Sequence, residues 1–163
     1  MSARVQLALN VSNVDRAVEF YTELFQTQPA KRRPGYANFA IADPPLKLVL
    51  IENPGASSRL NHLGLEVFEQ AKVVEAHDRL QAAGLEVRNE DGVTCCYAVQ
   101  DKVWVSDPDA EPWEVYTVLE HSDSMGTSGD GVPVLAPGGA CRGKETRAAC
   151  IPERPTFDLA RSR

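Results

Sequence analysis

Two adjacent cysteines, Cys95 and Cys96, stand in the segment TCCYAVQDKVWV, residues 94–105. Thiolates are soft donors, and two of them on one segment can chelate a soft, thiophilic centre. A plainer interpretation is that both are small buried side chains on a strand, because free cysteine is among the most buried residue types. Neighbouring cysteines are poorly placed to form a disulfide with each other.

Three further side chains, Gln6, His62 and Glu114, form a candidate metal site. An imidazole, a carboxylate and an amide oxygen can hold a divalent first-row metal, and three protein ligands leave positions open for substrate and O2. The alternative is that His62 is a hydrogen-bonded structural residue and that Glu114 is a charge at a strand edge. The metal interpretation requires a fold that brings these three residues together.

An internal repeat predicts such a fold. Residues 62–67 (HLGLEV) match residues 6–11 (QLALNV) at an offset of 56, with Leu, Leu and Val in equivalent places. Side chains alternate between the two faces of a strand, so Gln6 and His62 are predicted on the face opposite this apolar stripe. Two repeats thus place coordinating side chains at one equivalent position.

Two weaker matches extend the repeat. Residues 96–101 (CYAVQD) match residues 38–43 (NFAIAD) at an offset of 58, and the closing strands align Glu114 with Leu48 on pattern alone. A leucine cannot bind a metal. The repeat therefore predicts three ligand positions and not four.

The elements that must position these residues form two β-α-β-β-β modules of one α+β domain, residues 1–120, divided into 1–56 and 57–120. The patterns predict a first strand at 4–11, a helix after a capping box at Ser12 and Asp15, further strands at 29–33, 36–42 and 46–52, and a second helix at 72–83 that Gly84 ends. The modules pair within one chain or between the chains of a homodimer, and the sequence leaves both arrangements open.

The repeat also makes a prediction for the thiols. It puts Tyr97 and Val99 towards the helices, so Cys96 would face the cavity while Cys95 would not. Both sulfurs can reach one atom only if the chain bends near residues 91–94, which predicts a mobile segment at the cavity rim. The strand pair that follows is predicted to turn at residues 100–102.

Composition excludes several classes of partner. The formal net charge is −6, and an acidic body without a basic stripe argues against nucleic acid or an anionic membrane as partner. The basic cluster at residues 31–33 is predicted to be a solvated strand edge. No apolar run reaches the roughly 20 residues of a membrane span, and the N-terminus lacks a secretory pattern, so we expect a cytoplasmic protein whose four cysteines are thiols.

The last segment, residues 121–163, is rich in Gly, Ser and Pro and has no sustained periodicity. It is predicted to be a disordered tail. We hypothesise that it folds over the cavity and offers a third thiolate from Cys141 or Cys150. His121, which opens it, is predicted to lie at the surface.

The two-module pattern, His62 in NHLGLEV and Glu114 in PWEVY resemble the vicinal oxygen chelate superfamily of glyoxalases, bleomycin-resistance proteins and extradiol dioxygenases. RPGYANFAIADPPLKLVL and TCCYAVQDKVWV resemble its cadmium-induced proteins and organoarsenical carbon-arsenic lyases, over residues 4–119. The sequence departs from that pattern at two places. Gln6 stands where related lyases commonly have histidine, and Ala110 occupies the glycine position of a DPDG turn.

This resemblance implies an Fe(II)-dependent dioxygenase that cleaves the carbon-arsenic bond of trivalent organoarsenicals and releases arsenite. Gln6, His62 and Glu114 would hold the iron, O2 would take an open position, and Cys95 and Cys96 would hold arsenic, with no catalytic residue beyond the metal centre. One alternative is a protein that sequesters cadmium or metalloids without turnover. Another is an extradiol or glyoxalase-type enzyme, for which the paired thiols have no role.

Overall fold

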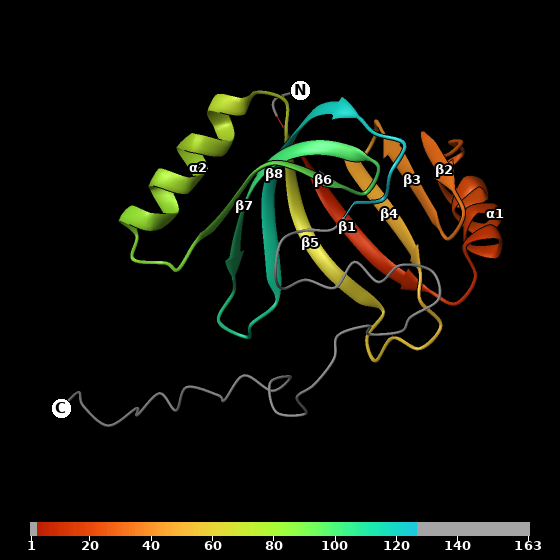
Figure 1. Cartoon of the computed structure of the whole chain (residues 1–163). Coiled ribbons are helices and arrows are strands. Elements are labelled where there is room, and N and C mark those ends of the chain that lie inside the picture. The colour runs from red at the N-terminus through yellow and green to blue at the C-terminus, as the bar shows by residue number, and fades with distance from the viewer. Residues whose placement is uncertain (1–2, 127–163) are drawn as a thin grey trace.

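The computed structural model describes residues 3–126, in which eight strands form one mixed sheet that curls into a half-barrel (Figure 1). Two helices lie outside the curl, and the concave face is left for a cavity. In chain order the elements are β1 Ala3–Val11, α1 Val14–Phe25, β2 Lys31–Arg33, β3 Tyr36–Ile41, β4 Leu46–Glu52, β5 Leu60–Val67, α2 Gln70–Ala82, β6 Arg88–Cys95, β7 Ala98–Ser106 and β8 Pro112–His121.

The predicted pair of β-α-β-β-β modules is confirmed, and both modules belong to one chain. The strand order is β2-β3-β4-β1-β5-β8-β7-β6. Within each module the first strand pairs in parallel with the last, β1 with β4 and β5 with β8, while β1 and β5 pair antiparallel and join the modules. This junction places the two repeat-equivalent strands side by side at the centre of the sheet.

Helix α1 covers the convex face of the first module. Val14 and Val18 are buried in one apolar cluster with residues of β1, β3 and β4, as the helical spacing of these side chains predicts. The predicted capping box at Ser12 is wrong by one residue: Asn13 is the N-cap, and its side chain accepts a hydrogen bond from Arg16 N at 2.9 Å. Helix α2 ends before Gly84, whose φ of +78° confirms the predicted left-handed position.

The predicted turn at residues 100–102 is wrong, because these residues lie inside β7. The chain reverses instead at Cys96 and Tyr97, whose φ angles are +54° and +62°, with Cys95 paired to Ala98 across the turn. Positive φ at both central residues is the type I′ geometry of tight hairpins. Asn-Gly is its usual sequence, so Cys-Tyr gave no turn signal.

The register also corrects the alignment of the closing strands. Ala8 pairs with Val49 of β4, and the repeat-equivalent Gly64 pairs with Glu114 of β8. Val49, and not Leu48, is therefore the counterpart of Glu114. Leu48 points into the cluster beneath α1, but both residues are apolar, so the expectation of three ligand positions is unchanged.

The match of residues 96–101 with 38–43 is likewise not a structural equivalence. Asn38 pairs with Val49 and Trp104 with Glu114, so β3 and β7 correspond at an offset of 66. Tyr97 does not face the helices; its ring lies 5.2 Å from that of Tyr36, on the concave side.

The described fold continues past the predicted boundary at residue 120. Strand β8 ends at His121, Ser122 N donates to Tyr97 O at 3.0 Å, and Gly126 forms an isolated bridge with Cys95. Cys141 and Cys150, and the hypothesis built on them, lie outside the described residues. No helix in residues 3–126 is long and apolar enough to cross a membrane.

Candidate metal and thiol site

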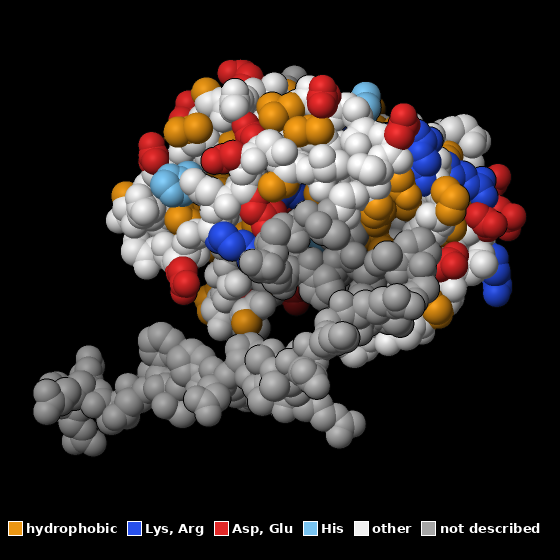
Figure 2. All heavy atoms as spheres, viewed as in Figure 1, with side chains coloured by type: hydrophobic (Ala, Val, Ile, Leu, Met, Phe, Trp, Pro, Cys, Tyr) orange, Lys and Arg blue, Asp and Glu red, His pale blue; other side chains and the backbone are white. Residues whose placement is uncertain are grey.

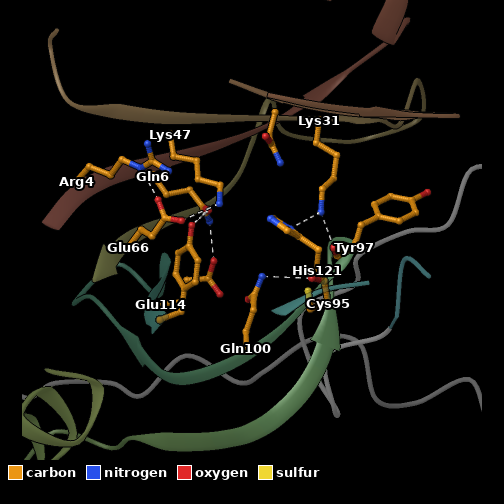
Figure 3. Close-up of polar contacts among 12 residues, drawn as sticks. Arg4, Gln6, Lys31, Lys47, Glu66, Cys95, Tyr97, Gln100, Glu114 and His121 are labelled. Atoms are coloured by element: carbon orange, nitrogen blue, oxygen red, sulfur yellow. Dashed lines mark hydrogen bonds and ion pairs between the residues drawn. The ribbon is translucent and has the colours of Figure 1, made fainter. Parts of the chain in front are cut away.

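One cavity on the concave face, with a volume of about 300 Å³, contains all five predicted site residues. Gln6, His62 and Glu114 line it together with both thiols, Cys95 and Cys96. Figure 3 shows Gln6 and Glu114 on one side of Gln100, and Cys95 on the other. The two predicted groups, which the sequence places far apart, thus share one enclosed space of a size typical for small ligands.

The three candidate ligands meet at the junction of the modules, where β1, β5 and β8 are neighbours. Each is at most 4% exposed. Gln6 Nε2 donates to Glu114 Oε1 at 2.6 Å and lies 3.0 Å from His62 Nε2, which is 3.2 Å from Glu114 Oε1. The predicted convergence is therefore present in the structure.

These spacings fit a divalent ion. Adjacent ligand atoms of an octahedral ion, each about 2.1 Å from it, are about 3 Å apart. In residues 3–126 no group of three His, Cys, Asp or Glu side chains could hold a metal. A metal at this junction would therefore need the amide oxygen of Gln6 beside His62 Nε2 and the Glu114 carboxylate.

The amide of Gln6 now turns its nitrogen to the other two ligands. Its Oε1 faces away and accepts a hydrogen bond from the Tyr116 hydroxyl at 2.5 Å. A half-turn of the amide would bring the oxygen to the ion and leave the nitrogen to donate to Tyr116, because a hydroxyl both donates and accepts. Tyr116 therefore supports either orientation of Gln6.

His62 is held in the tautomer that metal binding needs. Its Nδ1 lies 2.7 Å from Asn61 Oδ1, and Asn61 Nδ2 donates to Asn10 Oδ1 at 3.0 Å. Since Asn61 Oδ1 can only accept, Nδ1 donates to it, and in the neutral imidazole the lone pair is then on Nε2, which faces Gln6 and Glu114.

Gly64 allows the ligand strands to approach one another closely. It pairs with Gln6 on one side and Glu114 on the other. A Cβ atom here would lie 3.0 Å from Glu114 Cγ and 3.4 Å from Gln6 Cβ. Any side chain at this position would therefore press on two candidate ligands at once.

Glu114 is also paired with a buried lysine. Lys102, only 2% exposed, donates to Glu114 Oε2 at 2.8 Å. Burial alone would raise the pKa of Glu114, but the positive charge of Lys102 outweighs it and holds that pKa well below its usual range. The pKa of Lys102 is correspondingly raised, despite its own burial. Glu114 is thus a carboxylate ready to bind a cation, with Oε1 facing the other ligands.

The hairpin turn brings both thiols into the cavity, which a straight strand could not do. Cys95 Sγ and Cys96 Sγ are 3.4 Å apart. Two sulfurs bound to one soft centre at about 2.3 Å and about a right angle would be about 3.3 Å apart. The bend that the sequence requires is therefore present, but at Cys96 and Tyr97 and not at residues 91–94. Mobility of this segment stays a prediction.

The surroundings of Cys96 disfavour its thiolate form. The hydrogen bond with Cys95, burial and the charge of Cys95 raise the pKa of Cys96 well above its usual value. The positive charge of Lys102 acts in the opposite direction but does not outweigh these effects, so we expect proton loss from Cys96 to accompany binding of the soft centre.

Sequence reasoning missed four contributors. Tyr116, Asn61 and Lys102 act on the candidate ligands, and Lys31, predicted to be solvated, lines the cavity and donates to Tyr97 O at 2.6 Å. His121 also lines the cavity, although it is exposed as predicted. The alternation of side chains along β7 and β8 could have predicted Lys102 and Tyr116. Tyr116 is two residues from Glu114 and therefore lies on the same face of β8, and their cross-strand partners Lys102 and Trp104 lie on that face of β7.

Comparison with known proteins agrees with this geometry. The Glyoxalase/Bleomycin resistance protein/Dioxygenase superfamily profile matches residues 4–115. The cadmium-induced protein CadI of Mycobacterium tuberculosis is 59% identical over 125 residues, 77% of this chain and 82% of CadI. A trivalent organoarsenical cleaving enzyme of Thermomonospora curvata is 55% identical over 129 residues, 78% of this chain and 85% of that protein.

Solved structures share the fold at low identity. A homoprotocatechuate 2,3-dioxygenase variant from Brevibacterium fuscum superposes with a TM-score of 0.52 and 18% identity, over 76% of this chain and 34% of that one. The curl of the sheet, the repeat across β1 and β5, the profile match and the similarity to these relatives agree. The chain belongs to the glyoxalase/bleomycin resistance protein/dioxygenase superfamily, alongside the cadmium-induced proteins and the trivalent organoarsenical cleaving enzymes.

Proposed function

We propose that this protein is an Fe(II)-dependent dioxygenase that cleaves the carbon-arsenic bond of trivalent organoarsenicals and releases arsenite. The observation that carries the proposal is that one cavity holds both a soft dithiol and a hard three-ligand set. The name of the relative from Thermomonospora curvata supports the same substrate class.

Cys95 and Cys96 anchor the arsenic in this proposal. A trivalent organoarsenical with two hydroxyl groups forms two arsenic-sulfur bonds with them, and each thiol proton leaves with one hydroxyl as water. The organic group stays on arsenic inside the cavity. Anchoring turns a bimolecular encounter into an oriented one, which can lower the activation free energy by several kcal/mol.

Gln6, His62 and Glu114 would hold Fe(II), which supplies the electron transfer that lets O2 react with an organic group. Lys102 fixes Glu114 from the opposite side through Oε2, and Asn61 fixes His62. Burial of all three ligands excludes bulk water from the carbon-arsenic bond.

Sequestration without turnover is the second candidate, and Gln6 favours it. A neutral amide is a weaker donor than the histidine common in related lyases, and the relative from Mycobacterium tuberculosis is named for its induction by cadmium. Glyoxalase chemistry with four protein ligands is disfavoured, because Val49 occupies the fourth equivalent position.

Arsenic speciation separates these functions. We expect anaerobically Fe(II)-loaded protein to convert methylarsenite to arsenite after air is admitted, and we expect Cys95→Ser, Cys96→Ser and Glu114→Gln to lower this at least a hundredfold. Glu75→Gln, which removes an exposed carboxylate of α2 outside the cavity, is the matched control for Glu114→Gln, and its turnover should be unchanged. Methylarsenite that binds tightly but is recovered intact would establish sequestration instead.

A further inference from the structure

The cavity carries a charge opposite to that of the protein. The whole chain has a formal charge of −6, and on the face in Figure 2 acidic side chains are spread widely. The cavity lining, however, contains four side chains that are cationic at neutral pH and two carboxylates: Arg4, Lys31, Lys47 and Lys102 against Glu66 and Glu114. A ligand that enters therefore meets an excess of positive charge.

The pairing of these groups locates the excess. Lys102 is matched by Glu114. Arg4 and Lys47 share one carboxylate: Glu66 Oε2 binds Arg4 Nε, and its Oε1 accepts from Lys47 Nζ at 2.9 Å. Within residues 3–126, Glu66 is the one carboxylate at ion-pair distance from either cation. One positive charge remains uncompensated at this cluster.

The cluster is built into the cavity wall. The side chains of Arg4, Lys47 and Glu66 are 17%, 13% and 6% exposed. Burial would raise the pKa of Glu66, but hydrogen bonds and charge from Arg4 and Lys47 outweigh it and lower that pKa, so the carboxylate stays ionised. Lys47 also lies 5.5 Å above the Tyr116 ring. These contacts fix the cations where water screens them little.

The cluster and the thiols lie at opposite ends of the site. Figure 3 shows Arg4, Lys47 and Glu66 grouped around Gln6, on the side of the site away from Cys95. An arsenical held by the thiols would extend past the metal ligands towards this cluster. Lys31, for which residues 3–126 provide no ion-paired carboxylate, lies at the thiol end, where it donates to Tyr97 O and lies 3.3 Å from His121 Nδ1.

We propose that Arg4 and Lys47 form an anion subsite that selects trivalent organoarsenicals whose organic group carries an acidic substituent, such as a carboxylate, remote from arsenic. This inference rests on the proposed function in that the thiols must hold the arsenic. A carboxylate at this position bonds to the free N–H groups of Arg4 and Lys47 and offsets the excess charge. A neutral group of the same shape can accept the same hydrogen bonds, but these bonds are not charge-assisted on its side and are therefore weaker.

Binding to the metal-free protein tests the subsite without turnover. The probes are phenylarsenite, 4-carboxyphenylarsenite and its neutral isostere 4-carbamoylphenylarsenite. Their binding is followed by tryptophan fluorescence, to which Trp104 in the cavity wall contributes. We expect the carboxylate to bind about tenfold more tightly than the carboxamide, as one charge-assisted contact provides. Lys47→Met and Arg4→Met should each remove most of this preference, and Lys47→Arg should retain it.

Two further variants test whether the effect is local. Lys31→Met removes the same charge at the thiol end and should leave the carboxylate-to-carboxamide ratio unchanged. Glu66→Gln removes the competing carboxylate and should increase the ratio. Equal binding of carboxylate and carboxamide, or an equal loss of the ratio in Lys31→Met, would overturn the subsite.

Failure of the proposed function has a different signature. If Cys95→Ser and Cys96→Ser bind all three probes as well as the parent does, the thiols do not hold arsenic. Binding of benzoate, compared with benzamide in the parent and in Lys47→Met, then still decides whether the subsite takes anions.

Discussion

The side-chain amide of the candidate ligand Gln6 can be hydrogen-bonded to Tyr116 in either of two orientations, because a hydroxyl both donates and accepts. In this structure the Gln6 amide nitrogen contacts His62 and donates to Glu114, while its oxygen accepts from the Tyr116 hydroxyl. A metal requires the opposite orientation, in which Tyr116 accepts and does not donate. Because Tyr116 can do either, the amide turns without leaving a buried polar group unsatisfied, which would cost about 1–3 kcal/mol.

Tyr116→Phe should therefore weaken metal binding without removing a ligand. In the metal-bound orientation the Gln6 nitrogen would lose its partner, and we expect a loss of about 1 kcal/mol, or about fivefold in affinity for Fe(II). Anaerobic calorimetry measures this directly. The same substitution in a Gln6→His background should have a smaller effect.

Tyr36→Phe is the matched control. Tyr36 is also a buried phenol beside the cavity, but its hydroxyl accepts from Asn38 Nδ2 at 2.8 Å and contacts no candidate ligand. Its Fe(II) affinity should equal that of the parent. Equal losses in the two variants would mean that Tyr116 acts through general packing.

At the scale of elements, tight turns account for most of the differences between prediction and structure. The apolar stripes of β1, β5 and α1 follow from burial, so the sequence predicted them, together with the meeting of Gln6 and His62. The β6–β7 turn was missed because Cys96 and Tyr97 adopt positive φ without glycine or asparagine. Because the turn was predicted at residues 100–102 and not at Cys96 and Tyr97, residues 38–43 of the β3 region were matched to residues 96–101 and not to the equivalent part of β7.

The site was predictable only as far as the repeat reached. The equivalent strands β1 and β5 placed Gln6 and His62 together, and Glu114 followed from the pattern of the closing strand. The residues that act on these ligands depend on cross-strand register, which β-bulges shift. The register of β7 against β8 changes between Val99 and Gln100. A buried lysine such as Lys102 is also improbable from sequence alone, since lysine is almost never fully buried unless it is paired.

The turn before β8 allows a test of local strain. Ala110 has a φ of +66°, the left-handed conformation that the DPDA sequence suggested and that glycine adopts without steric cost. Ala110→Gly should raise the free energy of unfolding by roughly 1 kcal/mol. Urea unfolding provides the measurement, and Fe(II) affinity should not change.

An alanine with ordinary dihedral angles serves as the comparison. Ala83, at the C-cap of α2, has a φ of −78°, so Ala83→Gly relieves no strain. Its free energy of unfolding should stay the same or fall. A gain of equal size at both positions would show that the Ala110 effect is not conformational.

At the scale of the whole molecule, the chain separates an acidic exterior from a cationic cavity. The negative surface favours solubility and slows the approach of anions, whereas the cavity wall favours them once inside. Anion selection by Arg4 and Lys47 should therefore persist at salt concentrations that abolish long-range steering, because contacts with buried groups are screened less than surface fields.

The two halves of the site also differ in how much of the folded chain they require. Glu114 and Gln6 are 108 positions apart and come together only when β1, β5 and β8 pair. Cys95 and Cys96 are neighbours in any conformation, so an unfolded chain keeps a usable chelate. By linkage, a ligand stabilises a fold only to the extent that the unfolded state cannot bind it.

Fe(II) at a hundred times its dissociation constant should therefore raise the free energy of unfolding by about 2.7 kcal/mol. Phenylarsenite at the same saturation should raise it far less, and urea unfolding with each ligand compares the two. Equal increases would mean that the type I′ turn preorganises the thiols for arsenic. If the small increase is observed, the dithiol can bind an arsenical on a chain that has not finished folding, before the candidate metal site has formed.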